Sequence, residues 1–476
     1  MIDVLSVASE CAPLVKTGGL ADVAGALPAA LADEGVRMRT LLPGYRTVMA
    51  KVGRGETVVG ETVLAFDDLL GGPARVQACA VDGLDLLVLD APHLFDREGA
   101  PYGDATGADW PDNAQRFAAL SLAGARAAGE GLSDGWRPAI LHGHDWQAGL
   151  APVYLAERWP EAKVATLFTI HNIAYQGRVD GALLDTLGLP ASGLTEDGFE
   201  YWGDISFLKA GLMASDRLTT VSPTYAGELL TPEFGHGLDG VLRHRRDALT
   251  GILNGVDLDA WSPPFRSAAG KSPSRAKLRK AMGLGKADGP LCVVVSRLTG
   301  QKGLDILLDA LPRLLDEGGQ LALLGSGDRA LEAAFTQAAE THANVAVRIG
   351  YDEALARLMI EGGDAILVPS RFEPCGLTQL YGLTHGTLPL VAHTGGLADT
   401  VIPASPAGLR AKAATGIQFS PVNADALSRA FDRLMVLWRD PPIWRRMQRN
   451  AMNHPVGWDV SAGEYAALYR ELIEAS

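Results

Sequence analysis

Residues 365–382, with the sequence Ala-Ile-Leu-Val-Pro-Ser-Arg-Phe-Glu-Pro-Cys-Gly-Leu-Thr-Gln-Leu-Tyr-Gly, predict a strand, a tight turn and a helix in succession. The apolar run 365–369 is typical of a buried parallel strand, and residues 377–383 are expected to be helical. Pro374 and Gly376 shape the turn between them. A strand that leads through a turn into a helix is the repeating element of an α/β fold.

The same turn is a candidate anion site. The amides of Gly376, Leu377 and Thr378 are expected to point out of the helix start, where unpaired N–H groups and the helix dipole favour a phosphate. A carboxylate, Glu373, stands beside them. A surface turn with an ordinary solvated glutamate would have the same sequence, so the rest of the chain has to decide between the two interpretations.

Length and charge narrow the classes of protein to consider. The chain has 476 residues, which is too long for one core and predicts two domains of about 200 to 250 residues. The net charge of −14 argues against a nucleic-acid or anionic-membrane partner. The four cysteines lack the spacing of a disulfide framework or a zinc site, and no apolar stretch has membrane-spanning length. We therefore expect a cytoplasmic α/β protein.

Short apolar runs alternate with amphipathic stretches along the chain, which predicts βαβ units and a parallel sheet in each half. A stretch rich in Pro, Ser and Gly, residues 262–274, separates the halves. The expected strands are 4–8, 37–42, 84–89, 139–141, 164–170 and 217–221 in the first half, and 291–295, 321–324, 345–349, 365–368 and 388–391 in the second.

The hexapeptide Thr-Gly-Gly-Leu-Ala-Asp occurs at residues 17–22 and again at 394–399, each time after an expected strand and at the start of an expected helix. Coincidence is possible, but six identical residues in one setting favour two similar doubly wound halves. Ligands of such sheets bind beyond the carboxyl ends of the strands, so facing halves are expected to enclose a cleft. Lys16 precedes the first copy and is either a cation for an anionic ligand or a solvated lysine beside a tight turn.

Two expected strands of the first half are followed by histidines, in His142-Gly-His144-Asp145 and in His171-Asn172. A His-x-His pair suggests a metal, but no third ligand lies at ligand spacing, so we expect no metal site. A carboxylate and an imidazole at strand ends are better suited to hydrogen bonds with sugar hydroxyls. Asp145 could also stabilise a positive charge.

Arg297 and Lys302 follow the first expected strand of the second half. In an acidic protein these two cations suggest a clamp on a diphosphate, although a solvated face is the alternative. Residues 325–330, Gly-Ser-Gly-Asp-Arg-Ala, match the dinucleotide-binding pattern Gly-x-Gly-x-x-Ala and favour a dehydrogenase. That pattern lies deep in the second half with no obvious hydride-transfer residues around it, so we rank a dehydrogenase low.

Several motifs together resemble those of bacterial glycogen synthases and plant starch synthases, in family order along nearly the whole chain. They are Lys-Thr-Gly-Gly-Leu-Ala-Asp at 16, His-Asp-Trp at 144, Ile-His-Asn-Ile-Ala-Tyr-Gln-Gly at 170, Asn-Gly-Val-Asp at 254, Ser-Arg-Leu-Thr-Gly-Gln-Lys-Gly at 296 and the stretch that begins at 370. The resemblance implies a GT-B fold, with two Rossmann-like doubly wound domains facing a deep interdomain cleft. It also implies a retaining transfer of glucose from ADP-glucose to the non-reducing 4-OH end of an α-1,4-glucan.

The domain boundaries expected for this fold follow from the resemblance. Residues 1–250 plus 457–476 would form the acceptor and glucose domain, with a C-terminal helix that returns to it. Residues 251–456 would bind the nucleotide of ADP-glucose. The hinge would lie near 249–262 and 453–458.

The resemblance also assigns catalytic roles. The family's essential glutamate falls on Glu373, and its phosphate-binding cations fall on Arg297 and Lys302. The aspartate and the histidine beside the transferred glucose fall on Asp145 and His171.

Further residues are expected to bind substrate, with Tyr351 stacking on adenine. The set is Glu10, Lys16, Gly18, Gly19, Asp22, Asn172, Asn254, Tyr351, Cys375, Gly376, Leu377 and Thr378. Wider GT-B relatives often carry a second glutamate eight positions after the first, and Tyr381 occupies that position here.

The resemblance implies ADP-glucose and a glucan as partners. We expect no cofactor, metal, nucleic-acid or membrane partner. Two alternatives remain open at this point. One is another GT-B glucosyltransferase of the sucrose or trehalose type, and the other is a non-catalytic protein that binds nucleotide sugar or glucan.

Overall fold

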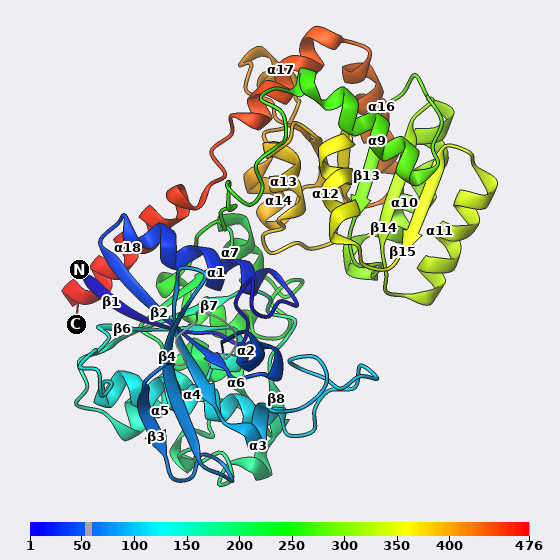
Figure 1. The fold of residues 1–476 in the computed structure, drawn as a ribbon. Coiled ribbons are helices and arrows are strands. Elements are labelled where there is room, and N and C mark those ends of the chain that lie inside the picture. Colours follow the sequence, from blue (N-terminus) through cyan, green and yellow to red (C-terminus); the bar gives the residue numbers. More distant parts are fainter. Residues whose placement is uncertain (53–59, 476) are drawn as a thin grey trace. The chain divides into compact units, whose positions relative to one another are not determined.

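A computed structural model describes residues 1–52 and 60–475, which form two compact units. Unit 1 contains Met1–Val221, Ala226–Gly255 and the C-terminal segment from Trp458 onward. Unit 2 contains Ser222–Tyr225 and Val256–Gly457. Figure 1 shows the elements of each unit. Among the described residues, no helix combines the length and apolar character needed to cross a membrane.

The described part of unit 1 is built on one sheet with the strand order β12-β11-β7-β6-β1-β2-β5-β4-β3. Its strands are β1 (Ile2–Val7), β2 (Val36–Pro43), β3 (Thr62–Phe66), β4 (Ala74–Val81), β5 (Leu84–Asp90), β6 (Ile140–His144), β7 (Ala165–Ile170), β11 (Arg217–Thr220) and β12 (Leu249–Gly251). The pairs from β12 to β5 are parallel, whereas β4 pairs antiparallel with both β5 and β3. The order reverses at β1, so the loops after β1 and β6 flank the switch point where ligands of such sheets bind.

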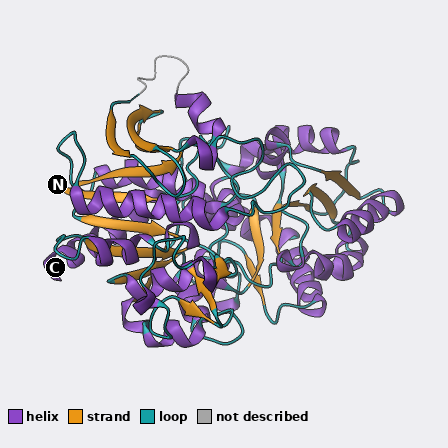
Figure 2. Cartoon of the chain, turned by 90° about the horizontal axis from the view of Figure 1, so that it is seen from below, coloured by secondary structure: helices purple, strands orange, loops and turns teal. Residues whose placement is uncertain are grey.

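Helices cover both faces of this sheet, and each face has its own apolar core (Figure 2). The helices are α1 (Gly19–Ala32), α2 (Arg46–Val52), α3 (Pro92–Phe95), α4 (Asn113–Glu130), α5 (Ala151–Arg158), α6 (Phe207–Ala214), α7 (Pro223–Leu229, which begins in the short segment of unit 2), α8 (Asp239–His244) and α18 (Trp458–Ala475). Tyr465 and Tyr469 of α18 are buried with Leu27 of α1, so the C-terminal helix belongs to the core of unit 1. A small antiparallel sheet of β8 (Arg178–Asp180), β10 (Asp204–Ser206) and β9 (Glu200–Tyr201) completes the unit.

The described part of unit 2 contains a parallel sheet with the order β15-β14-β13-β16-β17-β18. Its strands are β13 (Leu291–Val295), β14 (Gln320–Gly325), β15 (Val345–Ile349), β16 (Ala365–Val368), β17 (Leu388–Ala392) and β18 (Ile417–Phe419). Its helices are α9 (Ser272–Met282), α10 (Leu304–Asp316), α11 (Arg329–Thr341), α12 (Glu353–Gly362), α13 (Thr378–Thr384), α14 (Gly395–Thr400), α15 (Pro406–Arg410), α16 (Ala424–Trp438) and α17 (Pro441–Met452). The order reverses between β13 and β16, which makes the loops after these two strands the switch point.

Alternate residues of the central strands enter opposite cores of unit 2. Val294 packs with α10 and α16 on one face, and Val293 packs with α9 and α12 on the other. A strand that is buried on both faces needs apolar residues at every position, which explains the continuous apolar runs. The doubly wound α/β prediction is confirmed for both units, and each predicted strand is present with ends shifted by a few residues.

Candidate functional site

The predicted glutamate and lysine of unit 2 are in direct contact at the switch point. Lys302 Nζ lies 2.6 Å from Glu373 Oε2, and Ser370 Oγ donates a hydrogen bond to the same oxygen at 2.8 Å. Lys302 comes from the loop after β13, and Glu373 comes from the loop after β16. The Glu373 residue is only 7% exposed, so this ion pair sits in a partly dry environment where its electrostatic effect is strengthened.

The two loops that carry this pair are fastened together along their length. Arg371 N donates to Gln301 O at 2.8 Å, and the Arg371 guanidinium bonds both Gly300 O and the carboxylate of Asp305. Gly303 has φ +64°, and a Cβ added there would lie 2.0 Å from Pro369 O. Only glycine therefore allows the loop after β13 to approach this closely.

The turn that leads into α13 has its backbone fixed from inside the protein. Gln379 is fully buried, and its Nε2 donates to the carbonyl oxygens of Cys375 and Gly376 at 2.9 and 3.0 Å. In a planar trans peptide the N–H points away from the preceding C=O, so the amides of Gly376 and Leu377 face away from Gln379. Gly376 adopts φ +71°, which glycine tolerates without strain.

The second Thr-Gly-Gly copy lies directly against this turn. Gly396 N donates to Glu373 O and Pro374 O, both at 3.1 Å. A Cβ on Gly395 would lie 2.0 Å from Glu373 O, and one on Gly396 would lie 2.3 Å from Cys375 O. The glycines of residues 394–399 thus let the start of α14 support the turn that carries Glu373.

Other predicted residues of unit 2 lie outside the contact between Lys302 and Glu373. Arg297 follows β13 and is exposed, and no contact in the described structure brings its side chain to Glu373. Tyr351 follows β15 and is 87% exposed. Cys375 is buried within the turn. Tyr381, at the position of the second glutamate in wider relatives, stacks on Trp261 with ring centroids 3.7 Å apart.

The dinucleotide-like turn after β14 is occupied by the protein's own carboxylates. Asp328 Oδ1 accepts from Ala330 N and Leu331 N at the start of α11, and Gly327 N donates to Glu332. A Cβ on Gly325 would lie 1.9 Å from Ser296 O, so this glycine is needed for close packing. These contacts explain the glycines without a pyrophosphate and weaken the dehydrogenase interpretation.

In unit 1 the loop after β1 folds around the carboxylate of Glu10. Thr17 N, Thr17 Oγ1 and Gly18 N all donate to Glu10, and Tyr102 OH donates to it from another loop. Lys16 Nζ lies 2.6 Å from Asp22 Oδ1. Burial, opposed by Lys16, raises the pKa of Asp22. Gly19 begins α1. The structure therefore gathers the predicted residues of this loop into one site.

Asp145 and His171 meet at the carboxyl ends of β6 and β7. Asp145 Oδ1 accepts from His171 N at 2.7 Å and from Asn172 N at 3.3 Å. Asp145 adopts φ +54°, a strained conformation for a residue other than glycine, and such strain concentrates at functional sites. Burial of the carboxyl group raises the pKa of Asp145 to about 7, although the two backbone hydrogen bonds oppose the shift.

The histidines form a buried row behind Asp145. His144 Nδ1 lies 3.1 Å from His171 Nε2, and His142 bonds Tyr469 OH and Thr169 Oγ1. Burial lowers the pKa of both His142 and His171 to about 3, so these rings are neutral at physiological pH. No group of three potential metal ligands occurs among the described residues.

Sequence reasoning missed several residues that complete the site. Ser370 and Gln379 lie inside the quoted stretch but gave no signal, because a serine or a glutamine near a turn is common. Tyr102 lies far from Glu10 in the sequence, and nothing in the pattern links the two. Asn254, which was predicted, is buried, and its Oδ1 has no hydrogen-bond partner among the described residues.

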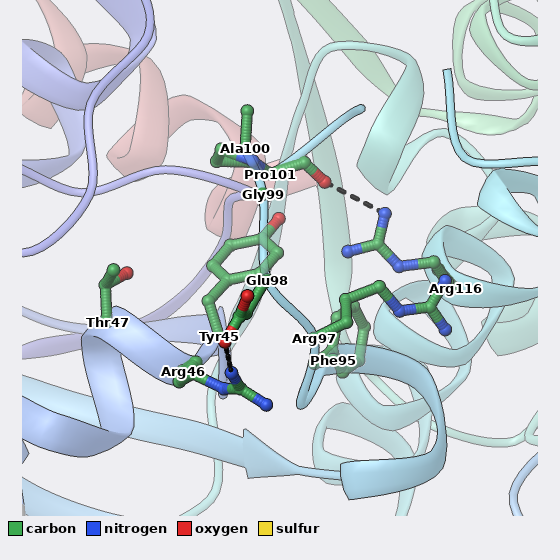
Figure 3. Close-up of a pocket in the computed structure, with 10 residues that line it drawn as sticks. All are labelled: Tyr45, Arg46, Thr47, Phe95, Arg97, Glu98, Gly99, Ala100, Pro101 and Arg116. Carbon is green, nitrogen blue, oxygen red and sulfur yellow. Dashed lines mark hydrogen bonds and ion pairs between the residues drawn. The ribbon is translucent and has the colours of Figure 1, made fainter. Parts of the chain in front are cut away.

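A pocket of about 240 Å³ lies in unit 1, lined by Tyr45, Phe95, Arg97 and Arg116 among others (Figure 3). The charges in its wall are largely satisfied, because Arg97 forms two hydrogen bonds with Asp112 and Arg116 donates to backbone carbonyls. The hydroxyl of Tyr45 is buried without a partner among the described residues. Aromatic rings and paired charges suit a neutral polar ligand better than an anion.

Two protein families match the chain. The starch synthase catalytic domain matches residues 3–244, and the family of glycosyl transferases group 1 matches residues 277–454. A glycogen synthase from Paracoccus denitrificans (strain Pd 1222) is 63% identical over 472 residues, which cover 99% of this chain and 100% of the relative. A glycogen synthase from Jannaschia sp. (strain CCS1) is 60% identical over 477 residues, which cover 99% of each protein.

Solved structures give the same assignment. The catalytic domain of starch synthase IV from Arabidopsis thaliana, bound to ADP and acarbose, superposes with a TM-score of 0.88 at 30% identity over 99% of both chains. Sucrose-phosphate synthase from Thermosynechococcus elongatus has a TM-score of 0.61 at 19% identity over the full length of both chains and shares the fold alone. The predicted GT-B fold and the predicted family are confirmed, and the chain belongs to the glycogen synthase family.

Proposed function

We propose that the protein transfers glucose from ADP-glucose to the non-reducing 4-OH end of an α-1,4-glucan, with retention of the anomeric configuration. The observation that carries this proposal is the contact between Lys302 and Glu373 at the switch point of unit 2, in a chain of the glycogen synthase family. The starch synthase IV structure bound to ADP and acarbose supports a nucleotide and a glucan as ligands.

The chemistry requires positive charge beside the departing phosphate. Cleavage of the anomeric bond leaves negative charge on ADP, and Lys302, Arg297 and the amides of Gly376 and Leu377 are the donors in unit 2 that would stabilise it. Tyr351 offers its exposed ring to adenine. We propose that these groups act without a metal ion or cofactor.

The charged residues at the switch point of unit 1 are better suited to bind the glucose of the donor than its phosphates. Three carboxylates, those of Glu10, Asp22 and Asp145, accompany the single cation Lys16 in the two groups of contacts at this switch point. An excess of negative charge disfavours a phosphate but stabilises the oxocarbenium character that develops on glucose. Asp145 and His171 are therefore proposed to bind the transferred glucose, and Lys16 to contact the donor.

Retention without a covalent intermediate is the mechanism we favour. Tyr381 is packed against Trp261 at the position where wider relatives carry a second glutamate. A double displacement needs a carboxylate pair about 5 Å apart. We propose instead a same-face reaction, in which the leaving phosphate helps to deprotonate the acceptor hydroxyl.

The pocket in Figure 3 is a candidate site for a glucosyl unit of the acceptor. Its lining of aromatic rings and ion-paired arginines is typical of a site for a neutral polar ligand such as a sugar ring. Under this proposal, Thr47→Val, which removes an exposed hydroxyl from the pocket lining, raises the KM for glycogen and leaves the KM for the donor unchanged.

A transfer assay with labelled donor and glycogen primer tests the proposed function. ADP-glucose should label the glucan in the presence of EDTA, and UDP-glucose should be a poorer donor. Binding of donor and glucan without turnover would favour a non-catalytic binding protein. Transfer to a small acceptor such as fructose 6-phosphate or glucose 6-phosphate, in place of glycogen, would favour a sucrose- or trehalose-type enzyme. We place the protein in the cytoplasm, where its nucleotide-sugar donor is made.

A further inference from the structure

Glu10 is a buried carboxylate whose hydrogen-bonding capacity is fully used within unit 1. Its Oε1 accepts from Thr17 Oγ1 and Tyr102 OH, and its Oε2 accepts from Thr17 N and Gly18 N. A carboxylate has about four lone-pair sites. Glu10 is 3% exposed, so a sugar hydroxyl could bind its carboxylate only by displacing one of these donors.

Three of the four donors to Glu10 come from the loop that carries Lys16. Thr17 and Gly18 follow Lys16 directly, so the backbone on one side of the lysine is tied to Glu10. Tyr102, the fourth donor, is itself held by Ser9 at 2.8 Å. The Lys16 side chain is 51% exposed and bonds Asp22 rather than Glu10.

We propose that Glu10 is a positioning residue and not a substrate ligand. It holds the backbone of Thr17 and Gly18 in place before substrate arrives, so that Lys16 meets the donor without first ordering its loop. Such preorganisation lowers the entropic cost of reaching the reactive geometry. The inference rests on the proposed function, in which Lys16 contacts the donor.

A double-mutant cycle tests this role. The four proteins are wild type, Glu10→Gln, Lys16→Ala and the double variant, compared by kcat/KM for ADP-glucose. Glutamine keeps the size of the side chain but removes its charge: the hydroxyls of Thr17 and Tyr102 can turn to accept from its NH2 group, while the amides of Thr17 and Gly18 keep only a neutral oxygen as acceptor. We expect Glu10→Gln to lower kcat/KM by up to about 100-fold, since small displacements of a binding group have effects of that size. In the Lys16→Ala background the same change should have little further effect.

Additive losses in the cycle would show that Glu10 acts on substrate directly and would overturn the proposal. A loss in Glu10→Gln with none in Lys16→Ala would overturn it as well. The matched control is Glu130→Gln, which changes an exposed glutamate paired with Arg126 at 2.9 Å and should leave kcat/KM unchanged.

Amide hydrogen exchange tests the positioning role separately from the proposed function. Thr17 and Gly18 amides should exchange faster in Glu10→Gln than in wild type, by more than the change in the slowest-exchanging amides of the same variant, which report any global loss of stability. Unchanged protection would overturn the proposal, whatever the transfer assay gives. Tyr102→Phe removes one donor with little risk to the fold and should show a smaller change in the same direction. A wild type that transfers no glucose would instead overturn the proposed function.

Discussion

The two copies of Thr-Gly-Gly-Leu-Ala-Asp have identical residues and both lie at the start of a helix, but they contact different kinds of group. In residues 17–22 the backbone amides point at a carboxylate, that of Glu10, and a Cβ on Gly18 would meet nothing within 4 Å. In residues 394–399 a Cβ on Gly395, the counterpart of Gly18, would lie 2.0 Å from Glu373 O, because the turn that carries Glu373 packs on the glycines.

The final aspartates of the two copies also have different partners, one within its own loop and one in a distant segment. Asp22 bonds the lysine that precedes its own copy. Asp399 accepts from Thr224 N at 2.8 Å and from Thr224 Oγ1 at 2.6 Å, in a separate segment of unit 2. The comparison teaches that a repeated motif preserves local geometry, while neighbouring segments decide whether that geometry holds a side chain or supports a backbone.

The largest expected difference is between the catalytic effects of removing Lys302 and Lys16. Lys302→Ala leaves the buried Glu373 without its ion-pair partner and removes a donor to the leaving phosphate. We expect kcat to fall about 10²- to 10³-fold, or about 3–4 kcal/mol of barrier, as for the loss of one preorganised donor. Lys16→Ala should cost less, because the Lys16 side chain is 51% exposed whereas that of Lys302 is 19% exposed. Steady-state kinetics of both variants would contradict the comparison if the ranking were reversed.

The glycines offer a second, steric test. Gly395→Ala, at the position equivalent to Gly18, places a methyl group against Glu373 O and should lower the free energy of unfolding by at least about 1–3 kcal/mol, as overpacking does. Gly18→Ala adds the same methyl group in open space, in an extended backbone, and should leave stability within about 0.5 kcal/mol of wild type. Denaturant unfolding of the two variants checks this, and equal stabilities would remove the distinction between the copies.

Titration of Asp145 should make both kcat/KM and stability depend on pH. Burial raises the pKa of Asp145 to about 7, so the carboxylate needed beside the glucose forms only as pH rises through that value, and kcat/KM should rise with it. Stability has the opposite sign. The raised pKa contributes stability that is fully present below the ordinary value near 3.8 and is lost as pH rises through about 7.

The matched variant for this prediction is Asp145→Asn, which should abolish both pH dependences and lower kcat/KM throughout. His171 should not interfere, because burial lowers its pKa to about 3. A kcat/KM profile with the same rise near neutral pH in Asp145→Asn would show that another group titrates.

The aspartates of the two copies offer a further test of stability. Asp399→Asn weakens two hydrogen bonds to a charged acceptor and should lower the free energy of unfolding by about 1.5–3 kcal/mol at most. Asp22→Asn breaks a partly exposed ion pair and should change it by less than about 1 kcal/mol. Thermal unfolding of both variants, measured in one buffer, would contradict the comparison if Asp22→Asn were the more destabilising.

Much of the fold was predictable because its central strands are buried on both faces. Residues 291–295 and 365–368 are uninterrupted apolar runs, and both proved to be strands at the switch point of unit 2. By contrast β4, Ala-Arg-Val-Gln-Ala-Cys-Ala-Val, mixes polar and apolar residues because it lies near an antiparallel edge, and it was not predicted. The two-residue β9 leaves almost no pattern to detect.

The candidate site was predictable where function requires a recognisable residue in a turn. Glu373 and Lys302 were expected together, and they are in contact. The groups that fix the geometry were not predictable, because Gln379 acts through carbonyls and Tyr102 reaches Glu10 across 92 positions of sequence. The predicted substrate contacts of residues such as Asn254 and Tyr351 remain predictions.

Calorimetric titration of ADP into wild type and Lys302→Ala tests the central claim most directly, since that claim is that the switch point of unit 2 holds the phosphates of the donor. We predict that wild type binds ADP and that Lys302→Ala binds it at least about tenfold more weakly, a loss of about 1.4 kcal/mol. Equal affinities in the two proteins, or no binding of ADP to wild type, would contradict the account.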